Sequence, residues 1–178
     1  MWRDGSDQAV ELPLPDSAIS GGALAFDNNG AIAGFYGDAD GVNQAVVWQP
    51  DGTITKLPRP TDVSDLVFVF ATEINGNWIL GEAVSPVGPY LRWNLSQVAG
   101  PERLGLDGAF GINPEGWIVG YDNDVAVVST GAGIVALPTL GGNANNPDLA
   151  RGISDDGHVI GGQSWRQNDL RAVQWTCQ

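Results

Sequence analysis

The chain is poor in the residues that build disulfides, catalytic centres and membrane spans. Its 178 residues include one cysteine and one histidine. The single cysteine, Cys177, cannot form an intrachain disulfide, so a disulfide framework is excluded. No apolar run is long enough to cross a bilayer, and Met1-Trp2-Arg3-Asp4 does not begin a signal peptide, so we expect no membrane insertion.

Basic residues are also scarce. The chain has 8 Lys and Arg against 21 Asp and Glu, which gives a formal net charge of −13. Such a surface repels the phosphates of nucleic acids and anionic lipids, so we expect neither as a partner. The same charge favours solubility or a cationic partner.

Long helical patterns are absent, and strand patterns take their place. The 25 glycines and 11 prolines interrupt the chain too often for long helices. Short alternating runs, such as residues 44–48 and 171–175, are typical of strands with one buried and one wet face. The sequence therefore predicts an all-β fold.

A repeat of about four units organises these strands. In each unit a strand of small residues is followed by a glycine-containing turn and three further strands. The third strand ends at tryptophan except in the third unit, which ends in Val127-Val128, and the fourth ends near Leu-Pro, degenerate at Leu104-Gly105. The second strands close on Gly34, Gly81, Gly120 and Gly161, and the tryptophans are Trp48, Trp93 and Trp175. A period near ~45 residues with several short strands per unit is typical of β-propeller blades.

The connections predict which strands share a blade. Compact turns join strands one to two and three to four of each unit, whereas long proline-rich stretches such as 58–65 and 140–147 separate the units. Tight turns join neighbours in one sheet, and long connections cross to the next sheet. We therefore predict one domain over residues 1–178, a small four-bladed β-propeller of about four antiparallel strands per blade. The repeat units are about 23–57, 70–104, 108–137, and 150–175 plus 8–14, so that the N-terminal strand completes the last blade.

Two phrases of the repeat resemble a known family. Residues 111–120 are Gly-Ile-Asn-Pro-Glu-Gly-Trp-Ile-Val-Gly, and residues 152–161 are Gly-Ile-Ser-Asp-Asp-Gly-His-Val-Ile-Gly. Together with Leu-Pro-Thr-Leu-Gly-Gly at 137–142, they make the chain similar to the bacterial extracellular repeats called the HAF family. The resemblance implies a propeller and an extracellular or cell-surface location. The family's His-Ala-Phe phrase is itself replaced, and no catalytic residues are carried over.

Signals for catalysis are few. His158 follows a turn and aligns with Ala31, Trp78 and Trp117 of the other units, and no Ser or Cys nucleophile stands near it in sequence. Pairs of carboxylates occur throughout an Asp-rich chain, so they do not indicate sugar hydrolysis. The sequence predicts a protein that is not an enzyme.

Candidate binding residues gather in the long loops. The strand order places the crossings between units and the loops between second and third strands on one face, and loops on a rigid scaffold commonly carry recognition. Exposed aromatic residues beside polar ones stack on sugars or anchor protein partners. The candidates are Tyr36, Asp38, Asp40, Tyr90, Asn145, Trp165 and Arg166.

One loop also has the alternating oxygen ligands of a calcium site. Asp38, Asp40 and Asn43 have that spacing, but the remaining ligands of a calcium loop are missing, and an ordinary tight hairpin prefers the same residues. Apart from Ca²⁺, no cofactor is indicated. On the inner strands, Glu73 and Arg151 are expected to form a structural pair across the channel or to bind an ion.

These observations predict a non-enzymatic module that binds a protein or a carbohydrate through its long-loop face. The alternative is a structural subunit that assembles into a ring or filament by strand exchange or surface contacts. A small hydrolase acting through His158 is a third hypothesis.

Overall fold

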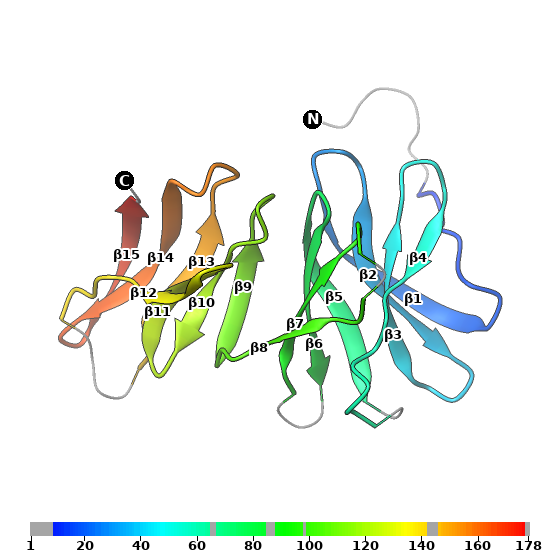
Figure 1. The fold of residues 1–178 in the computed structure, drawn as a ribbon, viewed down its shortest axis with the longest axis horizontal. Coiled ribbons are helices and arrows are strands. Elements are labelled where there is room, and N and C mark those ends of the chain that lie inside the picture. The colour runs from blue at the N-terminus through cyan, green and yellow to red at the C-terminus, as the bar shows by residue number, and fades with distance from the viewer. Residues whose placement is uncertain (1–8, 65–66, 85–87, 98, 142–145, 177–178) are drawn as a thin grey trace.

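The fold is all β, as predicted. The computed structural model describes residues 9–64, 67–84, 88–97, 99–141 and 146–176. Its strands form four antiparallel sheets (Figure 1). Among the described residues there is no helix that could cross a membrane.

The strands follow the chain sheet by sheet. The first sheet contains β1 (Ala18–Phe26), β2 (Ile32–Asp38), β3 (Asn43–Trp48) and β4 (Ile54–Lys56). The second contains β5 (Phe68–Asn75), β6 (Trp78–Val84), β7 (Tyr90–Asn94) and β8 (Glu102–Leu104). The third contains β9 (Gly108–Ile112), β10 (Ile118–Asp122), β11 (Val125–Thr130) and β12 (Gly133–Ala136). The fourth contains β13 (Leu149–Ile153), β14 (Val159–Arg166) and β15 (Asp169–Thr176).

Within each sheet, neighbouring strands are consecutive in the sequence. This is the strand order of propeller blades, and it confirms the prediction made from the lengths of the connections. The compact turns do join neighbours, and the long stretches do lead from one sheet to the next.

A bulge recurs in the first strand of every sheet. The strand pairing skips one residue at the same position each time; the skipped residues are Leu24, Thr72, Phe110 and Arg151. Beside each bulge the facing strand carries a glycine, at Gly34, Gly81, Gly120 and Gly162. At each of these glycines a Cβ would lie within 2.1 Å of a backbone oxygen, so the close approach of the two strands requires glycine there.

The repeat alignment was therefore wrong by one residue in the fourth unit, where Gly162 rather than Gly161 takes this place. The turn before β14 is longer than its counterparts. In the third sheet the Asn113 amide donates to the Trp117 carbonyl, whereas in the fourth the Ser154 amide donates to the Val159 carbonyl. His158 is thus the extra residue of a longer turn, and Val159 corresponds to Trp117.

The sheets pack face to face in series. The first two share a core that includes Ala33, Val47, Val69 and Ile79. A second core, around Leu80 and Ile118, joins sheets two and three, and a third, around Val119 and Ile160, joins sheets three and four. These cores bury apolar residues, but the predicted alternation of one buried and one wet face is not general. In β3 both faces are buried, because Ala45 and Val47 pack toward the second sheet while Val46 and Trp48 pack in a separate cluster with Leu12 and Leu14.

Tryptophan and proline fix the packing of successive sheets. The indole Nε1 of Trp93 donates to the carbonyl of Pro58 at 2.8 Å, and that of Trp175 donates to the carbonyl of Pro138 at 2.7 Å. In both cases the proline lies two residues after the outer strand of the preceding sheet, which ends at Lys56 in β4 and at Ala136 in β12. The tryptophans are buried, as expected for residues that pack between blades.

Closure into a four-bladed ring is not confirmed. Residues 9–14 form no strand, and the fourth sheet has three strands. The first and last sheets lie at opposite ends of the molecule (Figure 1). Leu12 and Leu14 pack instead against Tyr36 and Trp48 of the first sheet. The expected pairing of residues 8–14 with the last sheet is replaced by this contact, because the nearby first sheet offers the segment an uncovered apolar face.

Candidate ligand cleft

A cleft between the second and third sheets combines carboxylates with aromatic walls. It has a volume of about 260 Å³, and its lining residues are Thr72, Glu73, Glu82, Tyr90, Ala109 and Phe110. The bulges in β5 and β9 place Thr72 and Phe110, and the pairing of β6 with β7 sets Glu82 directly opposite Tyr90. The cleft is therefore built by backbone register rather than by long loops.

The cleft contains two carboxylates, those of Glu73 and Glu82, that take part in no ion pair among the described residues. Glu73 is exposed at the surface, yet the protein atoms around its carboxyl remove enough water to raise its pKa. The pKa of the Tyr90 hydroxyl is raised first by burial and then by the charge of Glu82.

The aromatic wall already holds one cation. The Phe110 ring stacks on Tyr121, with 6.0 Å between ring centroids, and the Arg151 guanidinium lies 4.1 Å from the Phe110 centroid. Arg151 therefore contacts an aromatic face, and no ion pair between it and Glu73 is present among the described residues. Cation–π contacts of this kind stabilise ammonium and guanidinium groups.

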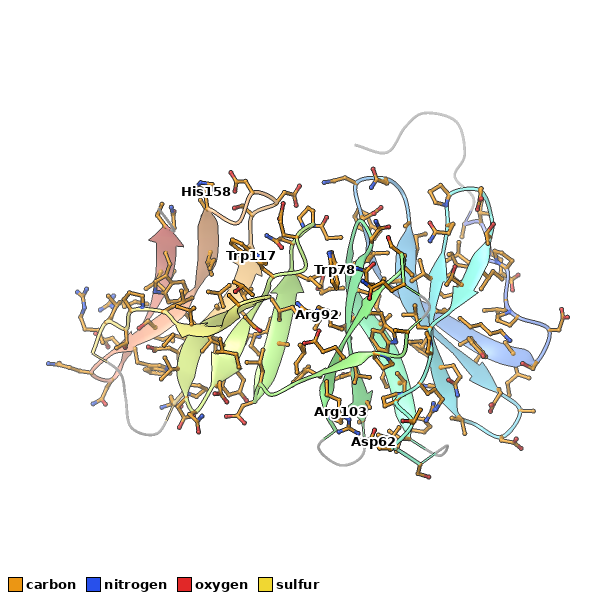
Figure 2. All side chains as sticks on the ribbon, in the orientation of Figure 1. Asp62, Trp78, Arg92, Arg103, Trp117 and His158 are labelled. Carbon is orange, nitrogen blue, oxygen red and sulfur yellow. The ribbon has the colours of Figure 1, made fainter. Side chains whose placement is uncertain are left out.

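Arg92 links the two sheets that form the cleft. Figure 2 shows it with Trp78 at the junction of the two halves of the molecule. Its Nη1 donates to the carbonyl of Gly116 in the third sheet's turn at 2.6 Å, its guanidinium pairs with Glu102, and it lies 5.0 Å from the centroid of the Trp78 ring. These contacts connect the second sheet to the third and so stabilise the relative position of the two sheets that line the cleft.

Two of the residues expected at a binding surface have structural contacts in the first sheet. Tyr36 is 6% exposed and lies beneath the ammonium of Lys56, 5.4 Å from its ring centroid. Asp38 Oδ1 accepts the amides of Asp40 and Val42, each at 3.0 Å, and so closes the hairpin between β2 and β3. These hydrogen bonds are those of an ordinary tight hairpin, which the sequence analysis left open as the alternative to a calcium loop.

No metal centre is visible in the described part of the chain. It contains no group of three His, Cys, Asp or Glu side chains that could hold a metal ion. Asp38, Asp40 and Asn43 lie around the hairpin, where Asn43 pairs with Gly37 across the two strands. Calcium at this hairpin stays a prediction from the sequence.

The remaining candidates lie on other sheets. Tyr90 lines the cleft. Trp165 and Arg166 end β14 in the fourth sheet, where the Trp165 amide donates to Asp148 at 2.8 Å and Arg166 is exposed. Asn145 lies outside the described residues. The candidates thus come from three sheets, and the structure does not bring them together.

His158 is exposed on the turn before β14 of the fourth sheet (Figure 2), whereas the cleft is lined by residues of the second and third sheets. Its Nδ1 lies 2.9 Å from the backbone oxygen of Asp156, and the Asp156 carboxylate accepts the His158 amide. The Ser154 hydroxyl donates to the same carboxylate at 2.6 Å, so the three side chains together shape the turn.

Sequence reasoning missed Phe110 and Glu82 as members of one site. One sequence signal for this site did exist. Equivalent positions of the four units carry residues of different type, although the residues around them repeat; these are Leu24, Thr72, Phe110 and Arg151. Variation at one position of a regular repeat indicates a surface that the fold leaves free. The bulge itself is invisible without the strand pairing.

Comparison with known proteins assigns no family. No protein-family model matches the chain, and no curated protein matches it. Among solved structures, a chain of "Crystal Structure of Mitotic Checkpoint Complex" resembles it with a TM-score of 0.48 and 10% sequence identity. The alignment covers 99% of this chain and 58% of that chain, so this chain spans little more than half the length of its match. A similarity of this size assigns neither fold nor function.

Proposed function

We propose that the protein is a non-enzymatic recognition module whose cleft binds a lysine or arginine side chain of a protein partner. The observation that carries this proposal is the pair Glu73 and Glu82, two carboxylates without ion-pair partners in the described part of the chain, set between Tyr90 and Phe110. An aromatic wall beside a carboxylate suits a cation with an apolar stem.

Charge and desolvation both favour such a ligand. The crowded surroundings of Glu73 disfavour its ionised form, and a bound cation would restore the interaction that water no longer supplies. At long range, the net charge of −13 attracts basic partners and speeds their encounter.

The size of the cleft suits a single side chain. Its volume of about 260 Å³ lies below the ~300–1,000 Å³ of pockets that enclose drug-sized molecules. A lone sugar ring would also fit by volume. The unpaired carboxylates favour the cation, because a neutral sugar leaves the charge of Glu82 and Glu73 uncompensated.

Binding of a fluorescent oligo-arginine peptide tests the proposal. We expect Glu73→Gln and Glu82→Gln each to weaken binding by up to about tenfold, since a hydrogen bond to a charged group contributes about 1.5 kcal/mol. Glu115→Gln is the matched control, because Glu115 is exposed on the turn between β9 and β10 and loses the same charge outside the cleft. Affinity is measured by fluorescence anisotropy at low and high salt.

Two results would contradict the proposal. Equal weakening by Glu115→Gln and Glu73→Gln would mean that the peptide responds to net charge and not to the cleft. Binding of neutral oligosaccharides that is lost in Phe110→Ala, together with no peptide binding, would replace the cationic ligand by a glycan.

A further inference from the structure

The first sheet leaves a face uncovered that is buried in the other sheets. Next to the bulge of the inner strand, Ala71, Ala109 and Ala150 are 0%, 6% and 0% exposed because the preceding sheet covers them, whereas Ala23 at the same position is exposed. Phe26 is 79% exposed where its counterpart Ile74 is buried. We call this uncovered side of the first sheet the head face.

The fourth sheet leaves the opposite side uncovered. Ala45 and Ala126, on the third strands of their sheets, are each 1% exposed because the following sheet packs on them. Ala172, at the same position of β15, is exposed, and so are Val159 and Leu170. We call this side the tail face; it also ends in β15, whose outer edge pairs with no strand in the part of the chain that the structure describes.

Residues 9–14 take the place that the end of the preceding sheet's outer strand takes at the other junctions. The Trp48 indole donates to the carbonyl of Pro13 at 2.7 Å, which repeats the contacts of Trp93 with Pro58 and of Trp175 with Pro138. In those two cases the proline follows the outer strand of the preceding sheet. Leu12 and Leu14 lie on the head face and border a groove of about 320 Å³.

The repeat specifies what this segment lacks. The leucine before each proline continues the outer strand: the Leu57 amide donates to the Ala45 carbonyl at 3.0 Å, and the Leu137 amide donates to the Ala126 carbonyl at 2.8 Å. The counterpart of these alanines in the fourth sheet is Ala172, on the free edge of β15. Leu12 would therefore pair with Ala172 if a fourth sheet preceded the head face.

The sizes of the facing residues are complementary. The first core contains Ala33 with Ile74, and Val119 packs in the third core with Ile153 beside it. At the corresponding positions, the tail face carries Gly161, with open space where a Cβ would be, and the head face carries the larger Phe26. If the tail face packed on the head face as successive sheets do, Gly161 would lie opposite Phe26, and the space beside the glycine would accommodate the larger side chain.

We propose that the head face of one copy of this chain binds the tail face of a second copy. Residues 9–14 of the first copy then add the missing outer strand to the fourth sheet of the second, and the interface repeats the packing between successive sheets of one chain. The contact protects the free edge of β15 and covers exposed apolar residues at both ends. Because the contact is heterologous, it builds a ring if its rotation closes and a filament if it does not. The inference is independent of the cleft and its ligand.

Variants at each end test the interface. We expect the unmodified chain to have at least twice its monomer mass in multi-angle light scattering, with rings or filaments in electron micrographs. Phe26→Arg blocks the head face at an exposed position. Ala172→Pro removes an outward amide from the edge of β15, where proline is tolerated, and blocks strand addition. Both variants should be monomers, whereas Val135→Arg, at an exposed position of β12, should assemble like the unmodified chain.

Mixing the two blocked variants gives the sharpest result. Phe26→Arg keeps a working tail face and Ala172→Pro keeps a working head face, so the mixture should form a dimer with one of each and nothing larger. Circular dichroism of each variant alone confirms that it is folded.

Two outcomes would overturn the inference. A monomeric unmodified chain at every concentration would show that the two faces do not bind each other between copies. Assembly that persists in both blocked variants would place the contact on another surface.

Discussion

Two adjacent glycines in β14 should respond in opposite ways to the same substitution. A Cβ at Gly162 would lie 2.1 Å from the backbone oxygen of Leu149 and 3.0 Å from the Trp175 ring, so one of the paired strands would have to move. Within one copy of the chain, a Cβ at Gly161 would meet nothing within 4 Å. Comparing the two substitutions isolates the effect of steric fit on stability, because both replace a glycine by alanine in the same strand and in neighbouring positions.

The two substitutions should change the free energy of unfolding in opposite directions. Overpacking costs about 1–3 kcal/mol, and the upper end applies to Gly162→Ala because the obstructing atom belongs to the backbone. For a chain of this size, ~3 kcal/mol lowers Tm by about 6–12 °C. Gly161→Ala should instead stabilise the fold by about 0.4–1 kcal/mol, since alanine restricts the unfolded chain more than glycine does.

The assay is thermal and urea denaturation followed by tryptophan fluorescence, because Trp175 lies at the affected site. Gly30→Ala serves as a comparison, since its positive φ of 87° strains any residue with a Cβ and the cost there comes from the backbone angle. If Gly161→Ala destabilised the protein as much as Gly162→Ala, the assigned bulge and the register of β13 with β14 would be wrong.

Three further predictions concern the junctions between sheets and the cleft. Trp93→Phe removes the indole that donates to the Pro58 carbonyl and should cost about 1 kcal/mol in urea denaturation, because a partly buried hydrogen bond is lost; an unchanged midpoint would contradict this role. Arg92→Lys keeps the charge but loses the planar contact that reaches Gly116, and should lower stability by about 1–2 kcal/mol by thermal denaturation, whereas equal stability would show that charge alone matters. Burial raises the pKa of Glu73, so the wild-type stability it contributes is present below about pH 4.3 and is lost as pH rises through the raised pKa. Glu73→Gln should therefore be more stable at neutral pH, by less than about 0.5 kcal/mol, and equal in acid; greater stability of the wild type at neutral pH would contradict the desolvation.

The strand order could be predicted from the sequence because it depends on local chemistry. Glycine, asparagine and aspartate at compact turns such as 28–30 set which strands are neighbours. The alternation along residues 44–48 correctly indicated a strand, but residues 45–48 are all buried, so it did not predict which side chains are exposed. The recurring tryptophans were correctly expected in the packing between sheets. The error at Gly161 arose because a turn that is longer by one residue leaves no mark in the repeat itself.

The candidate site could be predicted only in part. Tyr90 belongs to the cleft, but Phe110 and Glu82 join it through a bulge and a strand register that the sequence does not display. Tyr36 shows the reverse case, since an aromatic residue near a loop is buried by Leu12 and Leu14 from the N-terminal segment. Long-range packing therefore decided which aromatic residues remain available for binding.

The sequence by itself determined the all-β class, the order of the strands within sheets and the acidic surface, because turns, alternation and charge act over a few residues. The tertiary structure decided which sheets meet, where residues 9–14 lie and which carboxylates stay unpaired. Those outcomes depend on contacts between segments far apart in the chain, where the fit of apolar faces such as those around Trp48 and Trp93 outweighs any local preference.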